Sequence, residues 1–466
     1  MGLYDAIFES IVLPWKDQRH GRPVLPRIPV WTERLSGPRA RWQGEQATLL
    51  RQMLVHAAET VPFWSERFRD AGFDPRSVAS VADLRPLPLL TKDEVRDERV
   101  RLLSTAVPES RRVCRTTGGT TSRPLTFYRD DACHADREAL AWAFYGWFGR
   151  TPAHRHALAW GAVSDFGGAE SFRSRVRARY YERCLTLSVA TLDDRSMARF
   201  IDRFQRFEPL YMHGYAQSIF MLARAFERHQ ARTPSLRGVS LTAEPIEKDQ
   251  QAFIEHVFGC PAQNVYGCRE FGMMAAQCRE RRDLHLNPLS VVVEILDPEG
   301  NPAAPGESGE IVVTDLLNRA MPLIRYRLED YGTLSDVLCP CGLDLPSLDV
   351  TAGRVADFLV MPDGRTISAL VLIDVVYSPA FELAQLHQPE RARVDLLYVP
   401  SAAFSESSLQ AILARLSEIF GPAVRVAGRA VESIPRSTSG KTRIAVSDVA
   451  KDVLLSSQRS RPEASV

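Results

Sequence analysis

The sequence lacks any apolar run near the roughly 18 residues that a membrane-spanning helix needs. It also lacks an excess of either charge, because 58 Lys and Arg stand against 57 Asp and Glu, a formal net charge of +1. This balance gives no support for a nucleic-acid partner, which usually requires a strongly basic face. The first residues, MGLYDAIFESIVLPWK, have no basic region or cleavage site of a signal peptide, and Ala6 breaks the myristoylation pattern. We therefore expect a cytoplasmic protein without a membrane span.

Cysteine is too scarce for a disulfide framework. The chain has eight cysteines in 466 residues and no secretion signal, so paired cysteines are not expected. Four of them are scattered, and we predict that they are small buried hydrophobic residues: Cys114, Cys133, Cys184 and Cys260. The four cysteines from Cys268 onward occur near other polar residues and are treated below.

The pattern of apolar residues predicts an α/β fold. Residues 46–71 place apolar side chains at helical spacing, with Leu49, Leu50, Met53, Leu54 and Ala57 on one face. Short apolar runs (HALAWGAV, PLYMHGY, VSLTAEPI) then alternate with helical stretches, which is typical of a layered α/β core. SVVVEIL and GEIVVTDL flank a turn-rich segment and predict a β-rich subdomain.

A smaller unit begins after Gly353. It contains a strand (RVDLLYVP), a helix from Ser408 and a second strand (AVRVAGRAV), which together predict an α+β domain. A length of 466 residues also suits more than one domain. We therefore predict a large N-terminal α/β domain over residues 1–352 and a small C-terminal domain over residues 353–466.

The stretch RTTGGTTSRP at residues 115–124 has the composition of a phosphate-binding loop. Glycines let the backbone N–H groups approach a phosphate, and threonine and serine hydroxyls add further donors. The same composition also suits a surface turn. A second stretch, Gly440-Lys441-Thr442, resembles the end of a Walker A motif, but Pro435 occupies the position of its first glycine. By itself Lys441 is an ordinary loop lysine.

Six short motifs occur in a fixed order along the chain. They are RTTGGTTSRP at 115–124, AEP at 243–245, YGCRE at 266–270, RYRLED at 325–330, GRVAD at 353–357 and SGKTR at 439–443. This set resembles the adenylate-forming superfamily of acyl-CoA synthetases, aryl-acid ligases and luciferases. Within it the chain is most similar to the phenylacetate–CoA ligase and capsule-biosynthesis branch. The resemblance covers nearly the whole chain, and the N-terminal helical segment before LPLLTKDEV is typical of that branch.

The resemblance implies that ATP activates a carboxylic acid. The carboxylate attacks the α-phosphorus, pyrophosphate leaves, and an acceptor takes the acyl group from the acyl-adenylate. RTTGGTTSRP then contacts the β- and γ-phosphates through Thr117, Gly118, Gly119, Thr120 and Thr121. Ser122 stands where the family usually has glycine. Either this serine is strained by about 1–3 kcal/mol or its hydroxyl adds a phosphate contact.

The later motifs supply the rest of the expected nucleotide site. By resemblance, Ala243, Glu244 and Pro245 lie along the adenine, and Tyr266 stacks near it. The expected polar contacts are Glu270 to Mg²⁺, Asp330 to the ribose hydroxyls and Arg354 to the ribose or a phosphate. The family usually has Thr-Gly before this aspartate, where this chain has Leu328-Glu329.

Lys441 is the expected catalytic residue for adenylation. Its ammonium group would bridge the substrate carboxylate and the α-phosphate, a contact worth about 3–4 kcal/mol in the transition state. Because Lys441 lies in the small domain, the resemblance implies that this domain is mobile and rotates about residues 353–357. Ala356 aligns with a pivot position where the family often has Asp or Lys, and a different rotation in this chain is one interpretation of that departure.

Two further groups of residues are predicted to bind other ligands. Cys278, His285, Cys339 and Cys341 form two pairs of ligands that suit tetrahedral zinc, and some members of the branch have a similar arrangement. The alternative is four unmetallated side chains. Tyr211, His213 and Tyr215 are candidates for the acid pocket, with Cys268 as part of its wall rather than a nucleophile.

The expected function is ATP-dependent activation of an aryl or hydrophobic carboxylic acid, followed by thioester formation with coenzyme A. An amine acceptor, which would give an amide or another C–N bond, is the alternative, and a carrier protein would have to act in trans. A nucleotide-binding scaffold without catalysis also stays open. The sequence does not decide whether the chain forms a homodimer.

Overall fold

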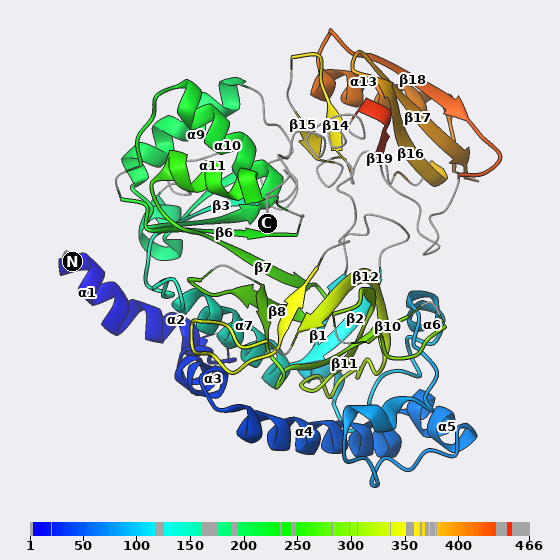
Figure 1. The fold of residues 1–466 in the computed structure, drawn as a ribbon. Helices are drawn as coiled ribbons and strands as arrows, with labels where there is room; N and C mark the ends of the chain where they lie inside the picture. The colour runs from blue at the N-terminus through cyan, green and yellow to red at the C-terminus, as the bar shows by residue number, and fades with distance from the viewer. Residues whose placement is uncertain are drawn as a thin grey trace, which may run out of the picture.

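The computed structural model supports the predicted α/β class (Figure 1). None of the described helices combines the length and apolar character that crossing a membrane requires. The described residues are 3–19, 21–116, 125–160, 176–188, 194–233, 235–243, 246, 248–280, 283–297, 299–304, 306–335, 337–350, 358–363, 366–368, 372, 378, 380–401, 403–434 and 445–449.

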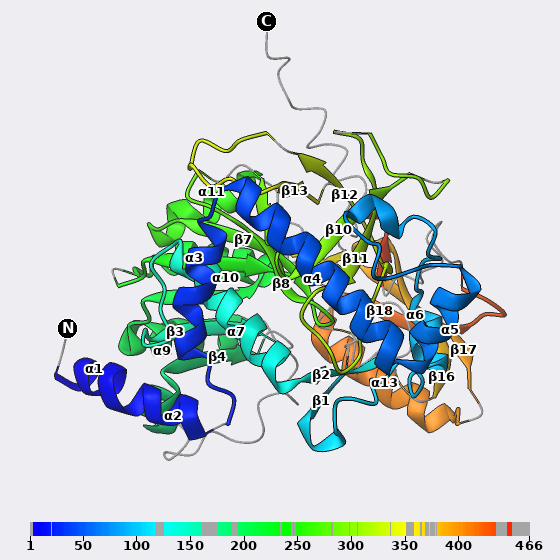
Figure 2. The same cartoon turned by 90° about the horizontal axis from the view of Figure 1, so that it is seen from below.

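The N-terminal segment is helical. Its α-helices are α1 (Leu3–Ile7), α2 (Leu13–Arg19), α3 (Ile28–Leu35), α4 (Arg39–Thr60), α5 (Pro62–Asp70) and α6 (Lys92–Asp97). The predicted helix over 46–71 is therefore two helices, because Pro62 keeps Val61 extended and starts a new one. Figure 2 shows α4 crossing the underside of the molecule. The predicted apolar face is confirmed, since Leu50, Leu54 and Ala57 are buried.

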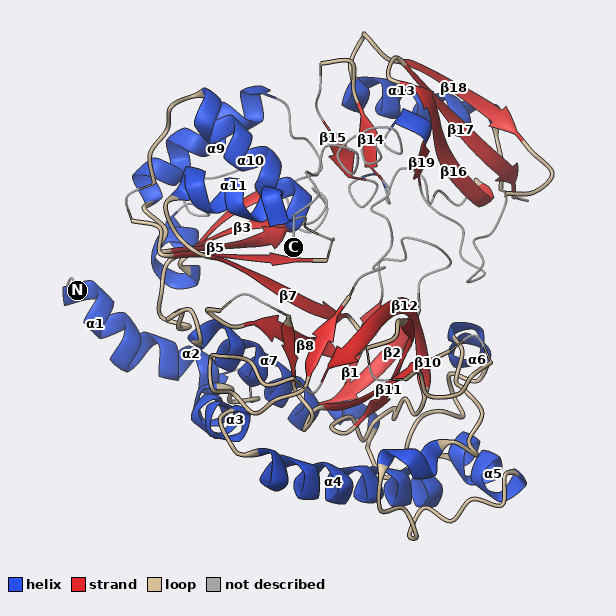
Figure 3. Cartoon of the chain, in the orientation of Figure 1, coloured by secondary structure: helices blue, strands red, loops and turns tan. Residues whose placement is uncertain are grey.

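Half of the main sheet is parallel. Its strands are β3 (His156–Trp160), β4 (Cys184–Ser188), β5 (Tyr211–Tyr215), β6 (Gly238–Thr242) and β7 (Ala262–Cys268). Three helices cover one face (Figure 3): α9 (Asp194–Phe207), α10 (Ala216–Arg228) and α11 (Lys248–Phe258). On the other face, α7 (Asp131–Gly146) accepts a hydrogen bond at its Phe144 carbonyl from Gln263 of β7, at 3.1 Å.

The other half of the sheet is antiparallel. Its strands are β8 (Gly272–Gln277), β9 (Leu284–Leu286), β10 (Val291–Leu296), β11 (Gly309–Asp315), β12 (Tyr326–Ser335) and β13 (Ser347–Asp349). Among the described residues, eleven strands form one sheet in the order β10-β11-β12-β13-β9-β8-β7-β6-β5-β3-β4. The predicted β-rich region corresponds to β10 and β11. A separate hairpin of β1 (Arg112–Thr116) and β2 (Thr126–Asp130) flanks the predicted phosphate loop.

The C-terminal part has its own sheet and core. The sheet order is β18-β17-β16-β19 in the part that the structure describes, and α13 (Glu406–Phe420) packs on it through Leu409 and Leu416. Its strands are β16 (Phe381–Glu390), β17 (Arg393–Pro400), β18 (Arg425–Ala430) and β19 (Ala445–Ser447), and a short ribbon precedes them, β14 (Phe358–Val360) with β15 (Thr366–Ser368). The helix expected from Ser408 starts earlier, because Ser405 caps it by accepting the Ser408 N–H. The domain boundary and the mobility of this unit stay predictions.

Candidate functional site

Some of the predicted nucleotide residues that the structure describes lie at one edge of the parallel strands. β5, β6 and β7 run side by side and end at Tyr215, Thr242 and Cys268. Ala243 comes directly after β6, and Glu270 comes two residues after β7. Ligands of open α/β sheets bind outside the carboxyl ends of the strands, so this edge is the expected place for the site.

Tyr266 and Asp330 come together from different halves of the sheet. The Tyr266 hydroxyl on β7 donates a hydrogen bond to Asp330 Oδ2 on β12, and the two oxygens are 3.0 Å apart. The predicted adenine and ribose contacts are thus adjacent in space, although 64 residues separate them in the chain. Gly267 is needed beside Tyr266, because a Cβ there would collide with the Gly272 carbonyl.

Glu270 is a buried carboxylate in a fixed setting. The Tyr326 hydroxyl donates to its Oε1 at 3.1 Å, and Arg137 donates to its backbone carbonyl. Arg137 is itself buried and pairs with Asp315 at 2.5 Å. Sequence reasoning missed Arg137, Asp315 and Tyr326. The one signal was a charge at position 137 on the apolar face of α7, in register with residues 133, 140 and 144.

The predicted phosphate loop begins next to the YGCRE motif. Arg269 Nη1 donates to the backbone carbonyl of Thr116 at 2.8 Å, and Arg129 donates to the backbone carbonyl of Arg269. Thr116 and Thr126 are paired across the β1–β2 hairpin. The two ends of the loop therefore lie close to the segment that carries Glu270.

Several predicted residues lie outside the described part of the chain, and their roles stay predictions. These residues are Thr117, Gly118, Gly119, Thr120, Thr121, Ser122, Glu244, Pro245, Arg354 and Lys441. The pivot position Ala356 also lies outside it.

Leu328-Glu329, which replaces the usual Thr-Gly of the family, has an unusual backbone conformation. Glu329 has φ of 63°, a left-handed conformation that favours glycine, the residue that the family usually has there. Lys92 lies beside it, with its Nζ 3.1 Å from Glu329 Oε2 and 3.4 Å from the Leu328 carbonyl. This lysine belongs to the LPLLTKDEV lead-in, so the lead-in supports a backbone turn next to Asp330.

The residues predicted for the acid pocket occupy different ends of β5. The His213 ring stacks on Trp160 with centroids 5.4 Å apart, and Tyr215 is 4.6 Å from the same tryptophan. Burial and the nearby Arg150 lower the pKa of His213 to about 3, so this imidazole is neutral at physiological pH. Tyr211 is at the other end, where its hydroxyl donates to the Phe148 carbonyl at 3.2 Å, a structural contact.

Cys268 lies at the carboxyl end of β7. Burial and then Glu270 raise the pKa of its thiol well above the ordinary value, so the thiol stays protonated at neutral pH. A protonated thiol is a poor nucleophile. This environment is consistent with the predicted place of Cys268 in a pocket wall.

The four predicted zinc ligands come together. Their ligand atoms all lie within 4.8 Å of one another, with Cys278 Sγ 3.7 Å from Cys339 Sγ and Cys341 Sγ 3.3 Å from His285 Nε2. Two thiolates bound to zinc at about 2.3 Å would be about 3.8 Å apart at the corners of a tetrahedron. The cluster therefore has the donor atoms and nearly the dimensions of a zinc site. It would tie the loop after β12 to β9, away from Tyr266 and Glu270.

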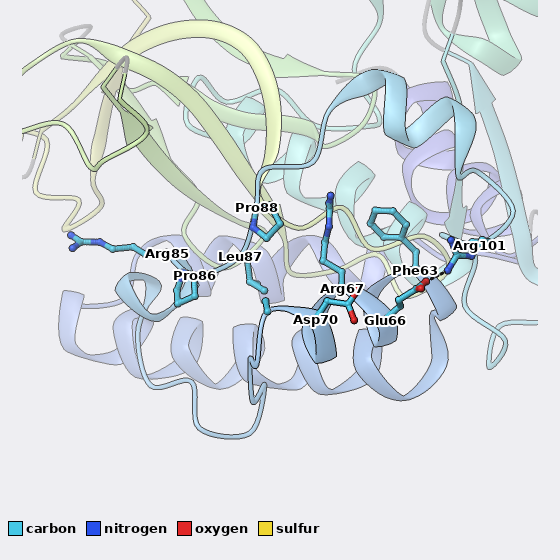
Figure 4. A pocket seen from close by; sticks show the side chains of 10 residues that line it. Phe63, Glu66, Arg67, Asp70, Arg85, Pro86, Leu87, Pro88 and Arg101 are labelled. Carbon is cyan, nitrogen blue, oxygen red and sulfur yellow. Dashed lines mark hydrogen bonds and ion pairs between the residues drawn. The ribbon is translucent and has the colours of Figure 1, made fainter.

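A cavity of about 610 Å³ lies apart from these residues, between α5 and residues 85–88 (Figure 4). Arg67 and Arg101 line it, but each already forms an ion pair, with Glu94 at 2.5 Å and with Glu66. None of the predicted site residues lines this cavity. We therefore do not place the active site there.

Comparison with known proteins agrees with the resemblance seen in the motifs. Residues 184–316 match the family described as AMP-binding enzyme. The phenylacetate-coenzyme A ligase of Escherichia coli is 27% identical over 385 residues, 79% of this chain and 83% of that protein. The corresponding enzyme of Thermus thermophilus is 26% identical over 340 residues, 70% of this chain and 73% of that protein. Protein CapK of Staphylococcus aureus is 22% identical over 401 residues, 83% of this chain and 85% of that protein.

The same fold occurs in solved structures. 2-Hydroxyisobutyryl-CoA ligase, in complex with 2-HIB-AMP and CoA, superposes with a TM-score of 0.63 over 92% of this chain and 94% of that one, at 19% identity. The predicted family is confirmed by the relatives and by the family match. The chain belongs to the adenylate-forming superfamily, in the branch of the phenylacetate–CoA ligases and CapK, and is an adenylate-forming ligase.

Proposed function

We propose that this chain activates a carboxylic acid with ATP and then transfers the acyl group to the thiol of coenzyme A. In the first step a carboxylate oxygen attacks the α-phosphorus and pyrophosphate leaves. In the second step the thiol sulfur attacks the acyl carbon, AMP leaves, and the thiol proton is released. The hydrogen bond between Tyr266 and Asp330 carries the proposal. It brings the residues predicted to contact adenine and ribose together, and Glu270 follows shortly after the strand that carries Tyr266.

Each part of the nucleotide has a proposed partner. Tyr266 and Ala243 would flank the adenine, Asp330 would accept from the ribose hydroxyls, and Glu270 would hold Mg²⁺, which would offset charge on the phosphates. The buried position of Glu270 supports this role, since carboxylate oxygens are preferred ligands of Mg²⁺. The remaining proposed contacts come from Thr117, Gly118, Gly119, Thr120, Thr121, Ser122, Glu244, Pro245 and Arg354.

Lys441 is the proposed catalytic residue of the first step. Its charge would offset the repulsion between the substrate carboxylate and the α-phosphate. Its place in the C-terminal unit requires that this unit move between the two steps, with the domain boundary at residue 353. The separate sheet and core of residues 381–447 support such a division.

The acid is proposed to be aromatic or hydrophobic. Trp160, His213 and Tyr215 present rings on the face of the sheet that α7 covers, and neutral His213 adds no charge there. Coenzyme A is proposed as the acceptor because four relatives are named phenylacetate-coenzyme A ligase. An amine or a carrier protein is the competing acceptor.

Hydroxylamine trapping with a panel of carboxylic acids tests the first step, and mass spectrometry of the CoA product tests the second. We expect hydroxamate and pyrophosphate that depend on both ATP and an acid. Absence of any acid-dependent pyrophosphate across the panel would refute the proposed activity. If pyrophosphate is released and no thioester forms, but an amide forms when amines are added, the chain would be a C–N ligase instead.

A further inference from the structure

Among the residues that the structure describes, Arg150 has no partner for its charge. This residue follows α7, is 6% exposed, and has Nε and Nη1 enclosed without a hydrogen-bond partner. No described residue forms an ion pair with it. Two other buried arginines form ion pairs, Arg137 with Asp315 and Arg325 with Glu294, and Arg129 donates to the Arg269 carbonyl. Arg150 differs from all three, because its guanidinium has neither an ion pair nor a hydrogen bond among the described residues, and an unpaired buried cation is costly.

The contacts of Arg150 are aromatic. Its guanidinium lies over the ring of Tyr145, 4.4 Å from the centroid, and 5.1 Å from that of Trp142. These ring faces stabilise the cation but accept none of its in-plane N–H groups. Arginine keeps its proton in proteins, so the charge persists at neutral pH.

Arg150 lies behind the proposed acid pocket. Tyr145, which it covers, meets the His213 ring edge-on at 5.6 Å, and His213 in turn stacks on Trp160. Arg150 also lies near the beginning of β5, because Tyr211, the first residue of that strand, bonds to Phe148. Tyr215, at the end of the same strand, is near the nucleotide residues. An acid with its reacting group at the strand ends would therefore direct its far end toward Arg150.

The histidines of this region carry no charge at physiological pH. Burial, and then Arg150, lower the pKa of His156 to about 3, as they do for His213. Both rings are neutral at physiological pH. The counter-charge for Arg150 must come from outside the described residues, and a substrate group is well placed to supply it.

We propose that the acid substrate is an aromatic dicarboxylate whose second carboxylate pairs with Arg150 while its ring lies among Tyr145, His213 and Trp160. The inference rests on the proposed function and specifies its substrate class. One carboxylate is activated at the strand ends, and the other stays ionised and accepts two N–H groups of the guanidinium. A carboxylate is the group that matches this planar donor pair.

Matched pairs of acids test the proposal on the unaltered protein. Terephthalate is compared with 4-methylbenzoate, and 1,4-phenylenediacetate with 4-ethylphenylacetate, by ATP-dependent hydroxamate formation. Because each diacid is symmetric, the choice of carboxylate does not affect the result. We expect kcat/KM to be roughly 10- to 100-fold higher for at least one diacid than for its partner. Equal or better activity with both monoacids would overturn the inference and leave the ligase function standing, whereas inactivity with these four acids and with the whole carboxylic acid panel would overturn both.

Variants of Arg150 separate a pairing role from a packing role. Arg150→Met should remove the preference for the diacid, with a gain for the uncharged partner, and Arg150→Lys should keep part of it. Arg206→Met, on the exposed part of α9, is the control and should leave the ratio unchanged. A ratio that persists in Arg150→Met would contradict the pairing. If Arg150→Met does not fold, the wild-type ratio and Arg150→Lys decide the question.

Discussion

The Tyr266 hydroxyl donates a hydrogen bond to Asp330 Oδ2 across two halves of one sheet, with 3.0 Å between the oxygens. Tyr266 lies on the strand that both halves share, whereas Asp330 lies on an antiparallel strand. The geometry of the proposed adenine and ribose contacts therefore depends on the sheet itself. Changes at either residue should affect nucleotide binding before they affect the fold.

Tyr266→Phe keeps the ring and removes this hydrogen bond. We expect the KM for ATP to rise roughly 3- to 10-fold, with a smaller change in kcat, because a bond of this kind is worth about 0.5–1.5 kcal/mol. ATP–pyrophosphate exchange measures both constants. Tyr331→Phe, at the exposed residue after Asp330, is the control and should behave as wild type. An unchanged KM in Tyr266→Phe would mean that the phenol does not orient the ribose contact.

Lys441→Ala tests the proposed catalytic residue. We expect adenylation to slow about 10²- to 10³-fold while ATP binding stays nearly unchanged, because the lysine acts on the charges that meet in the transition state. Pyrophosphate release measures the first property and equilibrium dialysis the second. Lys451→Ala, at a C-terminal lysine outside the SGKTR motif, is the control. Full activity in Lys441→Ala would refute its assigned role.

The Cys278, His285, Cys339 and Cys341 cluster should hold about one zinc ion per chain. Chelation or Cys339→Ser should lower the melting temperature, because the metal joins the loop after β12 to β9. Metal analysis of the purified protein gives the stoichiometry, and calorimetry gives the stability. Cys114→Ser should change neither, because Cys114 is exposed and not buried as its sequence context predicted. Fewer than about 0.2 equivalents of zinc would count against the site.

Glu329 offers a test of backbone strain. At φ of 63° glycine is less strained than alanine, so Glu329→Gly should be more stable than Glu329→Ala by about 1 kcal/mol, although both lose the ion pair with Lys92. Urea denaturation measures the difference. Lys92→Met removes the same ion pair and leaves the strained turn, so it should destabilise the protein. Equal stability of the two Glu329 variants would show that the turn relaxes.

His156 should make the protein sensitive to acid. Its pKa is about 3 in the folded state, below the unfolded value of about 6.5, so the folded state binds fewer protons. The stability that this histidine contributes is complete above pH 6.5 and is lost as pH falls toward 3, by roughly 2 kcal/mol at pH 5. His156→Gln should remove that part of the loss in urea denaturation at pH 7 and 5. His229→Gln, at an exposed histidine, should not.

Much of the fold was predictable because local patterns set it. The alternation of apolar runs and helices gave the layered core, and the β10–β11 pair followed from two apolar runs around a turn. The helix over 46–71 was wrong in one detail, since a single proline splits it. The helix predicted from Ser408 begins at Glu406, because the start of a helix depends on its capping side chain, here Ser405.

The site was predictable only as far as its motifs reach. The motifs identified Tyr266, Glu270 and Asp330, but their mutual distances depend on long-range strand pairing. Arg137, Asp315 and Arg150 lie outside every motif. Their roles follow from burial and pairing of charges, which no local pattern encodes.

β7 joins the two halves of the main sheet and so stiffens it. It is hydrogen-bonded to β6 on one side and to β8 on the other, so the described strands from β3 to β13 form one continuous hydrogen-bonded body. Bending that body would break a ladder of hydrogen bonds. The chain leaves this sheet at Asp349 and next enters a different one at Phe358. The motion that we propose for Lys441 is therefore expected to take place beyond Asp349, and not by bending of this sheet.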